Sequence, residues 1–285
     1  ASNGVIVITT RRGRNMEKAN VSLKAQFGVS SIAYGNWDLM NTAERIQYEK
    51  ETGMDAGQDY ALLSQTDVNW LEAVFNKFAI LQNYEVAVSG ATDKTNYFVS
   101  GAYYNQDGIA PASGFERYSF RTNFEQRLGS KVKMGVNMML NYQNIQQADE
   151  GNYTLVTPIS AARFMLPYWN PYREDGSLAS ISDGSWKGQG QNPLEWIANN
   201  PMKYKKYKAL AMGFVEADLY NGLTFRSQFS ADYSHSTGFG QSFPSYTPNL
   251  GEGTASRSSS DVLNLQISNT LTYKFNLSNI HDFTF

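Results

Sequence analysis

The feature that most constrains this chain is the alternation of tight turns and long loops between two-faced, strand-like runs. Only Thr92-Asp93-Lys94 joins the second run to the third, and Gly129-Ser130 joins the fourth to the fifth. Asn221-Gly222 joins the sixth to the seventh, and this pair predicts a hairpin with a type I′ turn. The runs are Asn20–Ser31, Leu81–Ala91, Thr95–Gln106, Glu116–Leu128, Lys131–Asn144, Tyr204–Tyr220, Leu223–Thr237 and Ser258–Phe275, with a further strand starting at Ile280.

Alternate connections of an up-and-down sheet lie on the same edge. All tight turns therefore fall on one edge, and the longer connections fall on the other. Short turns on one side and long loops on the other are typical of outer-membrane β-barrels, where they face the periplasm and the cell exterior. The pattern predicts an all-β fold, an antiparallel transmembrane β-barrel.

The alternation of side chains predicts an apolar face and a fully hydrophilic face on each strand. A soluble β-sandwich solvated on one face would show the same alternation. The barrel is favoured because the runs have about 11–18 residues, against about 5–6 in globular sheets. Aromatic residues also gather toward strand ends, as in interfacial girdles: Tyr84, Tyr103, Tyr104, Tyr142, Tyr233, Tyr273 and Phe275.

Composition agrees with a barrel and excludes other classes. No stretch approaches the roughly 20 apolar residues that a membrane-spanning helix needs. The formal net charge of -2 argues against a general nucleic-acid-binding protein. The polar faces of the strands are rich in long charged side chains, which suits a wide, wet lumen and part of a larger barrel. We expect Arg117, Arg121, Glu125, Lys133 and Arg226 to face the lumen, with Lys24, Arg127 and Asp232 on the same faces.

The first residues form an apolar run without alternation, which indicates a strand buried on both faces. Its residues are Gly4, Val5, Ile6, Val7, Ile8, Thr9 and Thr10, followed by Arg11-Arg12-Gly13. This segment resembles the end of the plug domain in TonB-dependent outer-membrane transporters of the SusC/RagA family. Similar motifs follow in the family's order at Gln82–Gly101, Asn105–Ile109, Gly114–Ser119, Asn192-Pro193-Leu194 and Gly222–Ser227.

The resemblance implies that residues 1–14 end the plug domain and residues 15–285 form the N-terminal part of the barrel. That part would be the first eight or so strands of a barrel of about 22. The export signal, the TonB-contacting segment and most of the plug would precede Ala1, and further strands would follow Phe285. The chain would be an internal fragment.

The resemblance also implies a function, namely TonB-dependent import of oligosaccharides or peptides in a Gram-negative, Bacteroidetes-like outer membrane. A SusD-like surface lipoprotein and the TonB complex, reached through the missing N-terminal part, would be partners. The sequence does not name the substrate. An alternative is a surface receptor or adhesin barrel that binds ligand without transport, for which a plug strand is not needed.

Catalytic and metal-binding motifs are absent from the sequence. Only His235 and His281 are available, and no metalloprotease, nucleophile-elbow or phosphate-loop motif occurs. We therefore expect no enzyme, no cofactor and no metal site, although a Ser/His/Asp site that uses His235 stays formally open.

The first long loop, Ile32–Ile80, is expected to be extracellular. It contains a predicted helix at Thr42–Thr52, capped by Asn41 or Thr42 and ended by Gly53. A second helix is predicted at Asp67–Lys77, with Trp70, Leu71, Val74 and Phe78 on one face.

Aromatic residues in the long loops are candidate contacts for a substrate or partner, although they equally suit a small loop core. The candidates are Trp37, Tyr168, Trp169, Tyr172, Trp186 and Trp196. The mixed run Lys203–Lys208 is not expected to bind nucleic acid. It falls where the sixth strand enters the outer leaflet, so we expect interfacial anchoring and contact with lipid or lipopolysaccharide phosphates.

Overall fold

The computed structural model of the chain describes residues 18–33, 35, 37–54, 57–148, 155–242, 253–277 and 281–284. The predicted plug strand Gly4–Thr10, like the whole segment assigned to the plug domain, lies outside the described residues. Among the helices of the described part, none is both long and apolar enough to cross a membrane.

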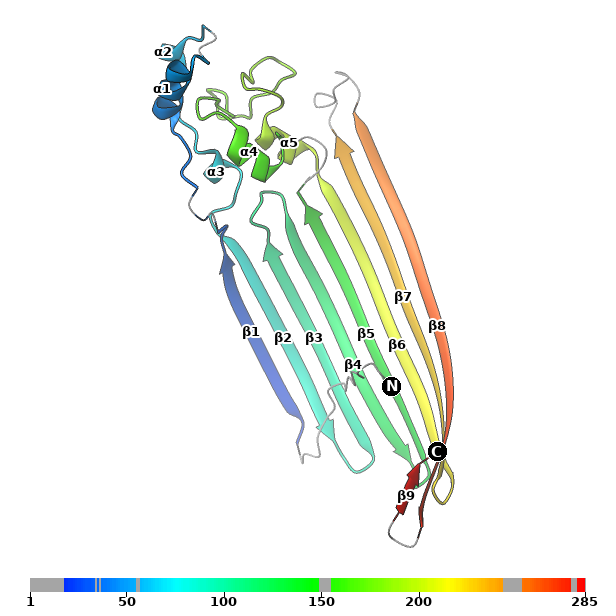
Figure 1. The fold of residues 1–285 in the computed structure, drawn as a ribbon. Helices are drawn as coiled ribbons and strands as arrows, with labels where there is room; N and C mark the ends of the chain where they lie inside the picture. Colours follow the sequence, from blue (N-terminus) through cyan, green and yellow to red (C-terminus); the bar gives the residue numbers. More distant parts are fainter. Residues whose placement is uncertain are drawn as a thin grey trace.

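The described strands form one antiparallel sheet in which each strand pairs with its neighbours in the sequence (Figure 1). This arrangement confirms the predicted up-and-down order and the start of a ninth strand. The sheet is open, because β1 pairs only with β2. The strands are β1 (Asn20–Ser30), β2 (Ala79–Ala91), β3 (Thr95–Asp107), β4 (Gly114–Leu128), β5 (Val132–Gln147), β6 (Met202–Tyr220), β7 (Leu223–Ser242), β8 (Thr254–Leu277) and β9 (His281–Thr284).

Two strands extend past their predicted loop ends. Strand β7 continues to Ser242 and β8 begins at Thr254, with Ser242 paired to Thr254 at the end of the ladder. The sequence signal is weak there because serine and glycine replace the alternating apolar residues. Backbone pairing extends both strands without that signal.

Figure 1 shows the helices gathered at one end of the sheet and the tight turns at the other. The two-residue connection Asn221-Gly222 is confirmed, but the predicted type I′ turn is wrong. That turn needs positive φ at both central residues. Gly222 has φ 80°, but Asn221 does not have a positive φ. In the described part of the chain, Ala112 is the one non-glycine residue that does. A register shift between Asp218 and Tyr220 adjusts the hairpin instead.

One face of the sheet is apolar and carries a row of aromatic side chains toward the loop end. Cross-strand register aligns the row, and its neighbouring ring centroids lie 4.8–6.5 Å apart. Between the level of this row and the tight turns, no charged residue occupies the apolar face of the described strands β1–β8. We call these residues the aromatic row: Tyr84, Tyr103, Tyr118, Tyr142 and Tyr207.

The height of the apolar band matches a membrane. From Val132 to Tyr142 the strand rises about 34 Å along its own axis. At a tilt of about 40° this becomes about 26 Å, close to the apolar band of outer-membrane barrels. Side chains in the band are strongly exposed, for example Leu23 at 75% and Ile267 at 68%, so the face requires a lipid environment. The aromatic row therefore marks the interface on the loop side.

Tyr104 does not belong to this girdle, contrary to the prediction. Successive side chains point to opposite faces, so Tyr104 lies opposite Tyr103. It sits under the guanidinium of Arg117 on the charged face, 5.4 Å from ring centroid to Cζ.

The predicted helix Thr42–Thr52 is confirmed as α1. Asn41 and Glu44 form a reciprocal capping box, and Gly53 ends the helix with φ 69°. The other helices are short: α2 (Tyr60–Leu63), α3 (Trp70–Ala73), α4 (Pro158–Phe164) and α5 (Pro193–Asn199).

The second predicted helix, Asp67–Lys77, is wrong in extent because only α3 forms. Beyond it, the backbone N–H of Asn76 donates to the carbonyl of Ile109 at 2.7 Å. The Asn76 side-chain amide donates to the carbonyl of Gly108 at 2.8 Å. These bonds tie the chain to the β3–β4 connection, and Phe78 is left 63% exposed.

Candidate functional site

The two long loops fold together into one layer at the end of the sheet, which we call the loop layer (the described parts of residues 31–78 and 148–201). Its core joins residues around α3 to residues around α4. Trp70 and Trp186 meet edge to face with centroids 6.1 Å apart. The core residues are Trp70, Leu71, Val74, Phe75, Ala161, Ala162, Met165, Ala179 and Trp186.

Hydrogen bonds fix the two loops in register with each other. The backbone N–H of Val68 donates to the Pro167 carbonyl at 2.7 Å. The Trp70 indole N–H donates to the Leu166 carbonyl at 3.0 Å. Since these partners are about a hundred residues apart in the sequence, the loop layer depends on tertiary packing.

A buried carboxylate provides a second link between the loops. Glu49 on α1 is only 3% exposed. It accepts hydrogen bonds from Arg45 Nε at 2.7 Å, the Tyr168 hydroxyl at 2.9 Å and the Tyr60 hydroxyl at 3.3 Å. Burial, followed by the hydrogen bond to Glu49, raises the pKa of Tyr168 well above its ordinary value. Glu49 therefore holds α1, α2 and the β5–β6 loop together.

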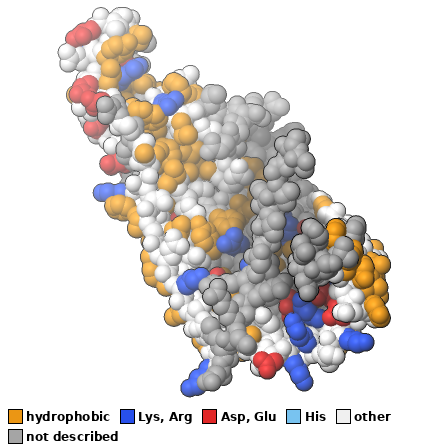
Figure 2. Space-filling model, turned by 60° about the horizontal axis from the view of Figure 1, so that its bottom comes forward, with side chains coloured by type: hydrophobic (Ala, Val, Ile, Leu, Met, Phe, Trp, Pro, Cys, Tyr) orange, Lys and Arg blue, Asp and Glu red, His pale blue; other side chains and the backbone are white. Residues whose placement is uncertain are grey.

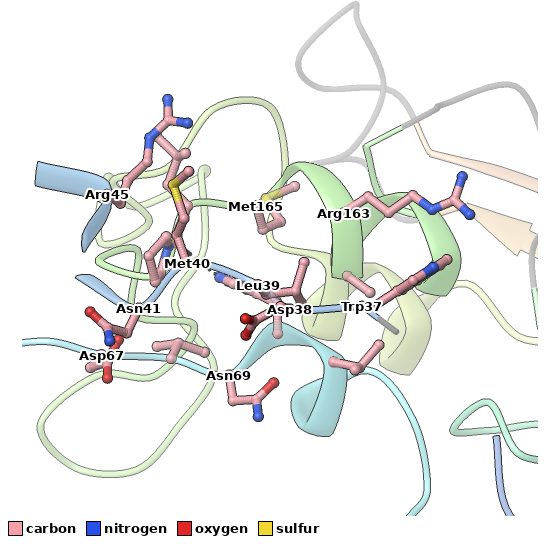
Figure 3. A pocket seen from close by; sticks show the side chains of 16 residues that line it. Trp37, Asp38, Leu39, Met40, Asn41, Arg45, Asp67, Asn69, Arg163 and Met165 are labelled. Carbon is pink, nitrogen blue, oxygen red and sulfur yellow. Dashed lines mark hydrogen bonds between the residues drawn. The ribbon is translucent and has the colours of Figure 1, made fainter. Parts of the chain in front are cut away.

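Beside this core lies a pocket of about 550 Å³, shown in Figure 3. Three segments line it: residues 37–45 before and within α1, residues 67–71 around α3, and residues 162–167 at the end of α4. Its labelled side chains mix apolar and charged groups: Trp37, Leu39, Met40 and Met165 with Asp38, Arg45, Asp67 and Arg163.

Arg163 and Trp37 form one end of the pocket. The Arg163 guanidinium carbon lies 4.3 Å from the centre of the Trp37 ring, which is a cation–π distance. Trp37 remains 38% exposed, so part of its indole is open to a ligand. Asp38 lies next to this pair, and within the described residues its carboxylate has neither a hydrogen bond nor an ion pair. The pocket thus offers an aromatic surface beside charges of both signs.

The predicted aromatic contacts divide into two groups. Trp37 lines the pocket, and Tyr172 is 47% exposed in the β5–β6 loop, so ligand contact stays a prediction for both. Tyr168, Trp186 and Trp196 are 4–5% exposed and pack inside the loop layer, as the alternative of a small loop core required. Trp169 is half-buried against the same core.

Of the residues that line the pocket, the sequence predicted only Trp37 as a contact, and it missed among others Asp38, Met40, Arg163 and Met165. They lie in irregular segments or in the unpredicted helix α4, where no periodicity marks them. Only packing between distant loops brings them together.

The charged face of the sheet carries all five residues expected in the lumen. Cross-strand register places Arg117, Arg121, Glu125, Lys133 and Arg226 opposite the apolar band. Figure 2 shows Lys and Arg side chains beside Asp and Glu side chains near the tight-turn end of the sheet, which comes forward in that view.

An aromatic ring lies within this charged face, and the prediction of a fully hydrophilic face is therefore wrong. Phe214 is only 4% exposed, with Arg226 Cζ 3.9 Å and Lys133 Nζ 5.4 Å from its ring centre. Glu216 pairs with both cations, at 3.0 Å to Arg226 and 3.9 Å to Lys133. Gly135 makes room for the ring, since a Cβ there would lie 2.5 Å from Phe214.

His235 lies on the apolar face of β7, beyond the lipid-facing band. Its Nδ1 is 2.8 Å from Asp261 Oδ1, which also accepts from the Tyr233 hydroxyl at 2.7 Å. The adjacent Ser234 and Ser236 side chains point to the opposite face. In the described part of the chain, no three His, Cys, Asp or Glu side chains gather closely enough to hold a metal ion.

No protein-family model matches the chain. TonB-dependent receptor P26 of Formosa agariphila is 27% identical over 295 residues, covering 99% of this chain and 28% of the receptor. TonB-dependent receptor SusC of Bacteroides thetaiotaomicron is 26% identical over 233 residues, covering 75% of this chain and 22% of SusC. The chain spans about a quarter of the length of these curated relatives.

Solved structures agree with the sequence relatives on the fold. The RagAB peptide importer in its 'closed-closed' state matches with a TM-score of 0.78 and 22% identity, over 96% of this chain and 34% of that chain. Its 'open-open' state matches with the same TM-score and 23% identity. The sheet and the relatives together define the wall of a TonB-dependent receptor barrel. Within that class the chain is similar to SusC and has the fold of the RagAB importer barrel, in agreement with the sequence resemblance.

Proposed function

We propose that the protein containing this chain imports oligosaccharides or peptides across the outer membrane, with energy delivered by the TonB complex. The observation that carries the proposal is the similarity to a TonB-dependent receptor along 99% of this chain. The charged inner face and the loop layer suit a wet lumen with a binding surface above it. The substrate class stays open between glycan and peptide.

The pocket of the loop layer is the proposed point of substrate contact. The open part of the Trp37 ring offers a stacking surface, and the Asp38 carboxylate offers a hydrogen-bond acceptor. Aromatic faces beside a few placed polar groups are typical of small-molecule sites. Both sugars and peptides can use such a surface, so the pocket is compatible with either substrate class.

A SusD-like surface lipoprotein is the proposed partner of the loop layer. The layer exposes large apolar side chains at the loop end of the sheet, which favours a covering protein. These residues are Met40, Leu62, Ile159, Phe164 and Tyr172, 46–61% exposed.

The test uses the full-length protein in its native host. Uptake and surface binding of labelled oligosaccharide and peptide mixtures are measured in wild type, in a deletion strain and in a strain with an altered TonB-contacting segment. An importer loses uptake but keeps binding when the TonB-contacting segment is altered. Uptake that persists in that strain contradicts the proposal, and binding without any uptake in wild type supports a receptor instead.

A further inference from the structure

A group of basic residues lies on the lipid-facing side of β6–β8, just beyond the aromatic row. The register sets Lys205 opposite Thr237, which is opposite Ser259. One step further from the membrane, Lys203 is aligned with Phe239 and Arg257. We call Lys203, Lys205 and Arg257 the basic patch.

The three basic side chains are available to a ligand. All three residues are exposed. Within the described residues, none of the three takes part in an ion pair or a side-chain hydrogen bond. Since adjacent strands lie about 4.8 Å apart, the patch extends about 10 Å across the sheet and about 7 Å along it. Those dimensions suit a phosphorylated headgroup.

On the lipid-facing side of the described strands, positive charge is confined to this patch. On the preceding strands, the positions level with Lys205 are neutral or acidic: Gln82, Asn105, Glu116 and Asn144. On β6–β8, Asp261 is the one acidic residue of the described apolar face, and it is already engaged by Tyr233 and His235. Three basic groups against this single carboxylate leave the patch with a net positive charge.

The position of the basic patch above an apolar, lipid-facing surface indicates which kind of ligand it binds. Below the level of Tyr207, His235 and Asp261 the same face is apolar. It carries Ala209, Leu263 and Leu265 on β6 and β8. An amphiphile with phosphate at the level of the basic patch would lay its acyl chains along this surface. A soluble anion would contact only the basic patch and would leave the apolar surface below it unoccupied. Guanidinium and ammonium groups bind phosphate through charge-assisted hydrogen bonds, and the hydroxyls of Thr237 and Ser259 lie between them.

We propose that the basic patch binds the phosphate of an anionic outer-leaflet glycolipid, namely lipopolysaccharide. The phosphate is neutralised by Lys203, Lys205 and Arg257, and it accepts hydrogen bonds from Thr237 and Ser259. The aromatic row lies at the level where the headgroup meets the acyl chains. The inference is independent of the transported substrate.

The experiment compares full-length protein purified in detergent with a variant that combines K203Q, K205Q and R257Q. Native mass spectrometry measures binding of phosphorylated lipid A, of the same lipid without phosphate, and of inorganic phosphate. Each basic residue near a lipid phosphate contributes about a fivefold change in affinity, so the triple variant should bind phosphorylated lipid A at least tenfold more weakly. Dephosphorylated lipid A should bind the wild type no better than it binds the triple variant.

A matched control carries K206Q and K208Q, which remove charges from the same strand but from the opposite face. This control should retain lipid A at wild-type strength. Equal binding by wild type and the triple variant overturns the proposal, as does equal binding of phosphorylated and dephosphorylated lipid by the wild type. Displacement of the lipid by millimolar inorganic phosphate would also overturn it, because the site would then recognise the free anion. Heat-modifiability on gels verifies that each variant has a folded barrel.

Discussion

Arg226 stacks on Phe214 on the charged face of the sheet, with Cζ 3.9 Å from the ring centre. Lys133 approaches the same ring, and Glu216 pairs with both cations. Phe214 thus lies buried beneath a network of two cations and a shared carboxylate. The charged face of the wall therefore contains a buried aromatic ring among its charged side chains.

The glycine beneath the ring provides the first prediction. Replacing Gly135 with valine should destabilise the barrel by about 1–3 kcal/mol, because added atoms would overlap Phe214 and overpacking forces side chains off their rotamers. The temperature at which the full-length protein loses heat-modifiable mobility measures the effect. Gly213→Ala on the adjacent strand is the control, since its Cβ would meet nothing nearer than 3.9 Å. Equal melting of both variants would contradict the packing described.

The buried carboxylate of the loop layer provides the second prediction. Tyr168→Phe removes the hydrogen bond to Glu49 and should loosen the loop layer by about 1.5–3 kcal/mol, as for bonds to charged groups. Limited proteolysis should then cut residues 31–78 and 148–201 faster, with the barrel intact. Tyr172→Phe, which alters an exposed ring, should leave the cleavage rate unchanged. If both variants are cut alike, the Glu49 link is not what holds the loops.

The pH dependence of the same link is the third prediction. Because the pKa of Tyr168 is raised in the folded state, its stabilising effect is fully present below the unfolded value of 10.0. As pH rises past 10, the unfolded form ionises while the folded form keeps its proton, so the loop layer should lose stability. Proteolysis of the loops measured from pH 9 to 11 should accelerate in wild type. Tyr168→Phe should show a flatter profile, and identical profiles would count against this assignment.

The pocket provides the fourth prediction, which rests on the proposed function. Trp37→Ala should weaken binding of the transported substrate about three- to tenfold, in line with the energy of one lost aromatic stacking contact. Calorimetry on the full-length protein with its identified substrate measures the change. Leu62→Ala on α2 removes another exposed apolar group outside the pocket and is the control. Unchanged affinity in the Trp37 variant would place substrate contact elsewhere.

The strands could be predicted from the sequence because their alternation, length and turns agree. Apolar or aromatic side chains occupy every second position from Val132 to Tyr142. Asn41, Glu44 and Gly53 mark both ends of α1 by local chemistry. The same pattern predicted a barrel, and the resemblance to one family added the plug strand and the expected total of about 22 strands.

The remaining features depend on contacts between distant residues. Asn76 ends the region of α3 by bonding to the β3–β4 connection, and no local signal marks that. The pocket needs Trp37 and Arg163, which are far apart in the chain. Phe214 interrupts a polar face, and its burial there depends on Gly135 and Arg226 from the two neighbouring strands. The turn at Asn221-Gly222 is not the predicted type I′ turn, and a register shift between Asp218 and Tyr220 lies next to it.

The shared core of the loop layer depends on the register of the wall below it. Trp70 belongs to the β1–β2 loop and Trp186 to the β5–β6 loop, so their contact requires β2 to β5 to be aligned. A slip of one residue in any intervening pair would turn its side chains to the wrong face and displace one loop from the other. The outward surface of the molecule therefore takes its native form only where the strands of the wall are in their correct register.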